Sequence, residues 1–292
     1  MTTPTLSLSR TDPNLAAVDV LSAKLDKANI EYDRLDRYYS GDQPLAFMSP
    51  EVEAQIGGRL TPLVINWPET IVDSVARRLN PEGFRLGQGA TADDELWRIF
   101  TANDLDEESP LGLVDMLVHG VTYLSVWGND DDPLTPRMTF ESAHQVTVDY
   151  EPGGRAVRSA LKRWQDGATS YATYYTRDEV IRYAARTTAL GVRPRYEIDQ
   201  VLANPLRAVP IVPMVNKGRL LNRSGRSELA SIAPIADGIN KLATDLLVTA
   251  EFYTTPRRWA TGMQMPSGSG DMARLQAEVK AYWDEASKEK TW

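Results

Sequence analysis

The chain contains no cysteine and only two histidines among its 292 residues. The lack of cysteine excludes disulfide bonds and thiolate-bound metals, and it gives no support for secretion. His119 lies within an apolar stretch and His144 at the start of an expected strand, with no second histidine at ligand spacing from either. A zinc site needs three or four converging ligands. We therefore expect no metal, no cofactor and no catalytic residue, and a His119 that belongs to the core.

Sequence signatures of common catalytic sites are missing as well. No G-x-x-x-x-G-K-[ST] loop occurs, which argues against an ATP-driven motor, and no G-x-S-x-G nucleophile elbow occurs. The first ten residues lack the apolar core of a signal peptide. The most apolar long stretch, 111–127, is interrupted by Asp115 and His119 and is too polar to span a membrane. We therefore expect a protein that stays in the cytoplasm of the cell that makes it.

The composition is that of a folded soluble protein, with 42% hydrophobic and 25% charged residues. The formal net charge is −8, so the total shows no basic excess of the kind that binds nucleic acid phosphates tightly. The length allows one large domain or two of ordinary size. At this point the residues leave open a soluble enzyme, a hydrolase or transferase with an unrecognised site.

The strongest periodic pattern runs from residue 227 to residue 262. Its apolar residues recur every three or four positions, which predicts one face of a long helix: Leu229, Ile232, Ile235, Ile239, Leu242, Leu246, Ala250 and Tyr253. Pro234 fits the first turn of a helix, so the regular part is expected to begin near Ala233, and Pro256 ends it. An ordinary amphipathic helix lying on a core would give the same pattern.

The remaining chain divides into a helical part and a part with period two. Helices are predicted at about 13–40, 66–80, 93–103, 111–119 and 271–287. Short strands are predicted at 84–86 and 121–126, and then as an antiparallel meander between 138 and 198. A last strand at 206–216 contains prolines, which place it at a sheet edge. These elements predict an α+β fold.

Several short segments occur in the order typical of one family. They read RYYSG at 37–41, NWP at 66–68, NDLD at 103–106, HGVTY at 119–123, VPIVPMVN at 209–216, GRSEL at 225–229 and AEFYTTPRRW at 250–259. Together they resemble the portal (head-to-tail connector) proteins of tailed double-stranded-DNA bacteriophages, the siphovirus type. Each motif alone is weak, but their shared order covers nearly the whole chain. The resemblance implies a structural protein rather than an enzyme, and a monomeric tail or adaptor protein is a further alternative.

The resemblance also implies an architecture. Portal proteins form dodecameric rings around an axial DNA tunnel, and each subunit has a wing, a stem of two long helices, a clip and a crown. By analogy, residues 1–225 form the wing, 226–256 the first stem helix and 257–292 the beginning of the clip. A second stem helix, a tunnel loop and a crown have no counterpart, so the chain is expected to end within the clip.

The same resemblance assigns roles to residues of the long helix and of the clip. The polar face of the helix would line the tunnel or a subunit interface, through Asp237, Lys241, Thr244 and Asp245. The packing face would lie against the second stem helix and neighbouring subunits, through Ile235, Ile239, Leu242, Leu246 and Ala250. Arg257 and Arg258 would contact a partner at the clip. In an isolated copy, Leu242, Leu246, Leu247 and Ala250 are expected to face water.

The implied partners are those of a DNA channel at one capsid vertex. They are other copies of the chain, capsid and scaffold proteins, the terminase large subunit and the head-completion (adaptor) proteins. Double-stranded DNA would pass through the ring during packaging and ejection without sequence-specific binding, which suits an acidic protein. No membrane partner is implied. The protein would be made in the host cytoplasm and then reside in the virion.

Overall fold

The computed structural model describes residues 12–44, 47–50, 54, 63–87, 91–186, 195–220, 222–254, 276–277 and 279–281. Contacts between residues divide the chain into two compact units, residues 1–248 and 249–292. The first unit contains the described sheets and nearly all described helical turns. The described part of the second unit consists of the last turns of one helix and short helical pieces.

Five helices carry the architecture of the described residues. They are α1 (Leu15–Ser40), α3 (Trp67–Ala76), α4 (Asp94–Ala102), α5 (Leu105–His119) and α6 (Leu229–Thr254). The end of α1 agrees with its sequence, because Gly41 adopts a left-handed φ of 78° and closes the helix. At the start of α3, the Asn66 side chain accepts a hydrogen bond from the backbone N–H of Glu69. None of the described helices is long and apolar enough to cross a membrane.

The described strands form two antiparallel sheets. The three-stranded sheet has the order β2 (Arg137–Glu141), β1 (Val121–Trp127), β8 (Ile211–Val215). The five-stranded sheet is a meander of β3 (Val146–Tyr150), β4 (Val157–Asp166), β5 (Thr169–Tyr175), β6 (Glu179–Arg186) and β7 (Glu197–Ala203). The proline-containing β8 lies at an edge, as its sequence predicts. The α+β class and the meander are confirmed.

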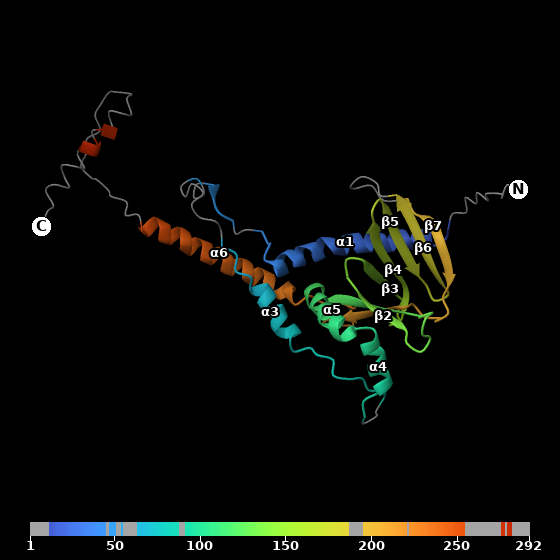
Figure 1. Cartoon of the computed structure of the whole chain (residues 1–292). Coiled ribbons are helices and arrows are strands. Elements are labelled where there is room, and N and C mark those ends of the chain that lie inside the picture. The colour runs from blue at the N-terminus through green and yellow to red at the C-terminus, as the bar shows by residue number, and fades with distance from the viewer. Residues whose placement is uncertain are drawn as a thin grey trace. The chain divides into compact units, whose positions relative to one another are not determined.

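Three apolar cores occur among the described residues, and helix α1 contributes buried side chains to two of them. Near its start, Val18 and Leu21 pack against the five-stranded sheet. Near its end, Leu35 and Tyr38 pack with residues of α3, α5 and the beginning of α6. The third core joins the two sheets and contains Val121, Tyr123, Ala143, Val146, Val148, Ala160 and Ile211. Figure 1 shows α1 in dark blue, beside the meander at one end and beside α3 and α6 at the other.

Three elements differ from the sequence prediction. Residues 84–86 form no strand. Helix α5 begins at Leu105 rather than 111, and α6 begins at Leu229 rather than near Ala233. Both helices therefore contain a proline at their sixth residue, which removes one backbone hydrogen bond close to the helix start. Burial of Leu105 and Leu229 in the core favours the longer helices over the local preference of proline for a first turn.

Candidate functional site

The beginning of α6 is held firmly against α5. The backbone N–H of Glu228 donates to the carbonyl oxygen of Leu117 at 2.9 Å. The Ser227 hydroxyl accepts the backbone N–H of Leu229 at 3.0 Å, which satisfies one free donor at the helix start. Leu229 and Ala233 are buried in the core that α1, α3 and α5 share. These contacts set the direction in which α6 begins.

Beyond Leu229, the side of α6 that packs on its own chain is made of small and polar residues. The buried residues of this side are spaced three or four apart: Leu229, Ala233, Ala236, Asn240 and Thr244. The Asn240 side-chain oxygen accepts the backbone N–H of Ile65 at 2.9 Å, and the Thr244 hydroxyl accepts that of Leu63 at 3.3 Å. The polar side chains thus satisfy backbone donors of an extended segment, which would cost free energy if buried without partners.

Beyond the first turn of α6, its large apolar residues are exposed. Leu242 is 71% exposed and Leu246 is 69% exposed, and Ile235, Ile239, Leu247 and Ala250 are exposed as well. Within the first compact unit, the structure therefore agrees with the expectation that Leu242, Leu246 and Leu247 face water. The role of Ile235, Ile239, Leu242, Leu246 and Ala250 as a packing face for another helix stays a prediction.

The residues of the expected polar face of α6 differ in how far their own chain covers them. Thr244 is buried by its own chain, so in this structure it does not lie on an exposed polar face. The Asp237 carboxylate oxygens lie 2.8 and 2.9 Å from the Tyr38 hydroxyl, which donates to them. Lys241 and Asp245 form an ion pair one helical turn apart. Asp237 is exposed as well, so the role of Asp237, Lys241 and Asp245 in a tunnel or interface face stays a prediction.

Two further assignments have no structural counterpart. Arg257 and Arg258 lie outside the described residues. The proposed domain boundaries at residues 225 and 256 stay predictions. The first compact unit extends to Val248, because the first turns of α6 pack on the rest of that unit.

Two glycines allow the segment before α6 to pass close to the backbone between α5 and the start of β1. Asn216, just after β8, donates its backbone N–H to the Gly120 carbonyl and accepts the N–H of Arg226, each at 2.9 Å. Gly225 has a φ of +75°, and a Cβ atom there would lie 2.0 Å from the Gly120 oxygen. A Cβ on Gly120 would meet the Arg226 backbone at 2.8 Å. Side chains would therefore force these backbones apart.

Glu228 ties the beginning of α6 to the end of β8. Its carboxylate accepts from the Asn216 side chain at 3.0 Å and from Lys217 at 2.5 Å. Burial acts to raise the pKa of Glu228, but the hydrogen bonds from Lys217 and Asn216 outweigh it and leave the pKa below its ordinary value. Lys217 is more than half exposed, so we expect only a modest contribution to stability.

Glu228→Gln is expected to lower the free energy of unfolding at pH 7 by about 0.5–1 kcal/mol. The folded pKa of Glu228 lies below that of the unfolded chain, so its stabilisation is complete above about pH 4.3. It is lost as pH falls through the folded pKa, and the two proteins then become equally stable. Urea unfolding between pH 3 and 7 measures the difference. Lys217→Gln should show the same pH dependence of the stability difference from the wild type. A difference in the free energy of unfolding that persists at pH 3 would contradict this prediction.

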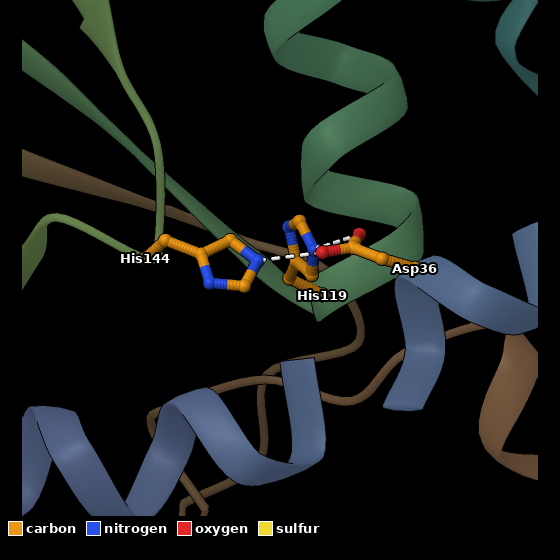
Figure 2. A group of neighbouring side chains, drawn as sticks. All are labelled: Asp36, His119 and His144. Atoms are coloured by element: carbon orange, nitrogen blue, oxygen red, sulfur yellow. Dashed lines mark hydrogen bonds and ion pairs between the residues drawn. The ribbon is translucent and has the colours of Figure 1, made fainter. Parts of the chain in front are cut away.

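The structure brings both histidines of the sequence onto one carboxylate (Figure 2). Asp36 comes from the last turns of α1, His119 is the last residue of α5, and His144 lies just before β3. His119 Nε2 is 2.7 Å from Asp36 Oδ1, and His144 Nε2 is 2.7 Å from Asp36 Oδ2. The expectation that neither histidine has a converging partner is therefore wrong.

Aromatic rings and a second carboxylate surround this cluster. The Tyr32 ring contacts both imidazoles, with centroid distances of 5.1 Å to His119 and 5.5 Å to His144. The two imidazole rings meet edge to face at 5.0 Å. Asp33, on the same helix as Asp36, places Oδ1 3.7 Å from His144 Nδ1. The side chain of His119 is only 3% exposed, as expected of a core residue, while Asp36 and His144 reach the surface.

An open groove of about 860 Å³ lies beside β8. Its lining includes Tyr150 and three arginines, Arg155, Arg219 and Arg223. The Arg223 guanidinium lies over the Tyr150 ring at 5.7 Å. The described lining contains no carboxylate, histidine, serine or cysteine, the side chains that most often act as acids, bases or nucleophiles. The groove therefore gives no support for an enzyme.

Comparison with known proteins gives a consistent result. The family model described as "Phage portal protein, SPP1 Gp6-like" matches residues 19–290. A portal protein of Mycobacterium phage D29 is 29% identical over 284 residues, which cover 93% of this chain and 56% of that protein. A portal protein of Mycobacterium phage L5 is 30% identical over 230 residues, covering 75% and 46%. The chain thus spans about half the length of the curated relatives it matches.

Proposed function

The chain belongs to the SPP1 Gp6-like family of phage portal proteins, and we propose that it is a structural subunit of the ring through which DNA enters and leaves the capsid. The resemblance to portal proteins deduced from the motif order is confirmed by the family match. This family is structural, which agrees with the prediction that the chain is not an enzyme and leaves the hydrolase or transferase alternative without support.

The observation that carries the proposal is the exposed apolar side of α6. Ile235, Ile239, Leu242 and Leu246 are spaced four, three and four residues apart, the spacing of a seam that packs against another helix. Soluble monomers rarely expose a contiguous apolar patch of this kind. Burial of one such leucine stabilises an assembly by about 1.5–3 kcal/mol. Contact with a neighbouring subunit would therefore favour a closed ring.

The opposite side of α6 supports the same role by its charge. Lys241 is paired with Asp245, and the Asp237 carboxylate is engaged by Tyr38. A helix whose single exposed cation is neutralised by its own neighbour offers little free positive charge to DNA phosphates. If Lys241 and Asp245 face the tunnel, DNA would pass without being held. In this proposal, residues 226–256 form the first stem helix and residues 257–292 form the beginning of the clip.

The finer assembly is also part of the proposal. It comprises a dodecameric ring at the portal vertex of the virion, in contact with capsid and scaffold proteins. The terminase large subunit would dock during packaging and the head-completion proteins afterwards, with Arg257 and Arg258 as contacts at the clip. Negative-stain microscopy and mass photometry of the complete protein, expressed together with its scaffold protein, should show closed rings with a central channel. A protein that stays monomeric at every concentration would contradict ring formation.

A further inference from the structure

The Asp36–His119–His144 cluster has the composition and geometry of a metal site, and the portal role does not require it. One ligand atom from each residue can be chosen so that all lie within 4.8 Å of one another. Two imidazole nitrogens and one carboxylate oxygen are ligands that Zn²⁺ and related divalent transition metals bind. We propose that these three residues form a binding site for a divalent transition metal ion, with zinc as the best fit.

The orientation of the side chains supports a single binding position. Both imidazoles direct Nε2 at the same carboxylate, one at each oxygen, as Figure 2 shows. Tetrahedral coordination with metal–nitrogen bonds of about 2.0–2.1 Å separates neighbouring ligand atoms by roughly 3.3 Å. To admit an ion, the two contacts of 2.7 Å must widen, and all ligand atoms, which now lie within 4.8 Å of one another, must adopt about this separation. Both imidazoles are thus directed at the same carboxylate group.

The contact at the second ring nitrogen of His144 also suits a bound metal. An imidazole that binds a metal through Nε2 carries its proton on Nδ1, and this N–H commonly donates to a carboxylate. Asp33 lies 3.7 Å from His144 Nδ1, so a small side-chain movement would complete such a bond. His119 Nδ1 is buried and has no hydrogen-bond partner among the described residues. Among the described residues, the outer contact that favours metal binding is therefore at His144 and not at His119.

The position of the cluster indicates a structural role with access to solvent. Asp36 is 43% exposed and His144 is 27% exposed, so an ion can enter and a water molecule can occupy a fourth ligand position. The three ligands belong to α1, α5 and the turn before β3. An ion at this point would cross-link elements that contribute to the different apolar cores of the first unit. The expected effect is stabilisation of that unit rather than catalysis.

The test is a metal titration of the chain after removal of bound metal with EDTA. Zn²⁺ should bind with a stoichiometry of one ion per chain in calorimetry and raise the melting temperature. Co²⁺ should give the absorption bands of a tetrahedral or five-coordinate complex, which zinc displaces. Absence of a cobalt spectrum and of binding heat in the wild-type chain at millimolar metal would overturn the proposal.

Variants separate this cluster from adventitious binding elsewhere on the chain. His144→Ala and Asp36→Asn should each lower zinc affinity by at least about 100-fold, and Asp33→Asn by about 10- to 100-fold. Asp19→Asn, a change of an exposed carboxylate on the same helix, should leave the affinity unchanged. Circular dichroism in EDTA checks that each variant is folded. Wild-type affinity in folded His144→Ala and Asp36→Asn proteins would show that the ion binds elsewhere.

Discussion

The double substitution Leu242→Asp and Leu246→Asp is expected to abolish ring assembly while the individual chain stays folded. Both side chains are about 70% exposed, so their loss removes few contacts within the subunit. At the proposed subunit contact, the loss of two buried leucines forfeits roughly 3–6 kcal/mol. Two carboxylates without partners add several kcal/mol if they are buried. Because about 1.4 kcal/mol is a factor of ten, association should weaken by at least roughly a thousandfold.

Mass photometry of the complete protein measures this loss of rings, and circular dichroism reports the fold. Leu134→Asp is the matched control, since Leu134 is 77% exposed in the turn before β2 and lies outside the apolar side of α6. This control should assemble as the wild type does. If the double variant formed rings at the same protein concentrations as the wild type, the exposed side of α6 would not be the subunit contact.

Gly225→Ala is expected to destabilise the chain strongly, by about 3 kcal/mol in the free energy of unfolding. The added Cβ would lie 2.0 Å from the Gly120 carbonyl oxygen and 2.8 Å from that of Asn216. Both are backbone atoms, and they take part in the hydrogen bonds between the end of β8 and neighbouring segments, so neither can move aside cheaply. The positive φ of Gly225 adds strain for any residue with a Cβ.

Gly238→Ala provides a control of opposite sign. Gly238 lies inside α6, and a Cβ there meets nothing within 4 Å. Alanine in a helix interior is favoured over glycine by about 0.5–1 kcal/mol, so this variant should be slightly more stable than the wild type. Urea unfolding of both variants at pH 7 gives the comparison. A Gly225→Ala protein as stable as the wild type would show that the crossing of the two backbones is not tight.

The sequence predicts the elements of the fold well, because their patterns are local. The apolar spacing and Gly41 define α1 and its end, and period-two alternation defines the meander. Element starts near proline are predicted less well. Pro110 and Pro234 suggest helix starts, whereas the structure begins α5 and α6 several residues earlier. Burial of Leu105 and Leu229 outweighs the local preference of proline, and sequence periodicity does not measure burial.

The direction in which α6 faces could not be deduced from hydrophobicity alone. Its large apolar residues suggest the inward side, but beyond Leu229 small and polar residues occupy the side that is buried within the chain. Asn240 and Thr244 are inward because the segment at 63–66 presents backbone N–H groups that need acceptors. Such a requirement arises from a segment 175 or more residues away in the sequence. Only the tertiary structure reveals it.

The histidine cluster shows the same limit for a candidate site. His119 and His144 lie 83 and 108 residues from Asp36, which is far beyond any recognised ligand spacing. Their convergence depends on how α1 crosses the end of α5 and the turn before β3. The scarcity of histidine was the one available signal, since both histidines of the chain meet at one carboxylate. A low number of histidines, however, does not predict where they lie in the folded chain.

The packing of α1 in two separate cores affects the order in which the chain folds during synthesis on the ribosome. Leu35 and Tyr38 are made early, but the residues of α6 that cover them follow much later, and Tyr38 is separated from its partner Asp237 by 199 residues. At a synthesis rate of about 5–20 residues per second, the delay is roughly 10–40 s. During that time the residues of α3 and α5 that belong to the same core can cover the end of α1 only in part. Leu229 and Ala233, which complete this core, are made just before the exposed apolar residues of α6. A nascent chain therefore gains its proposed subunit contact only as its own core becomes complete.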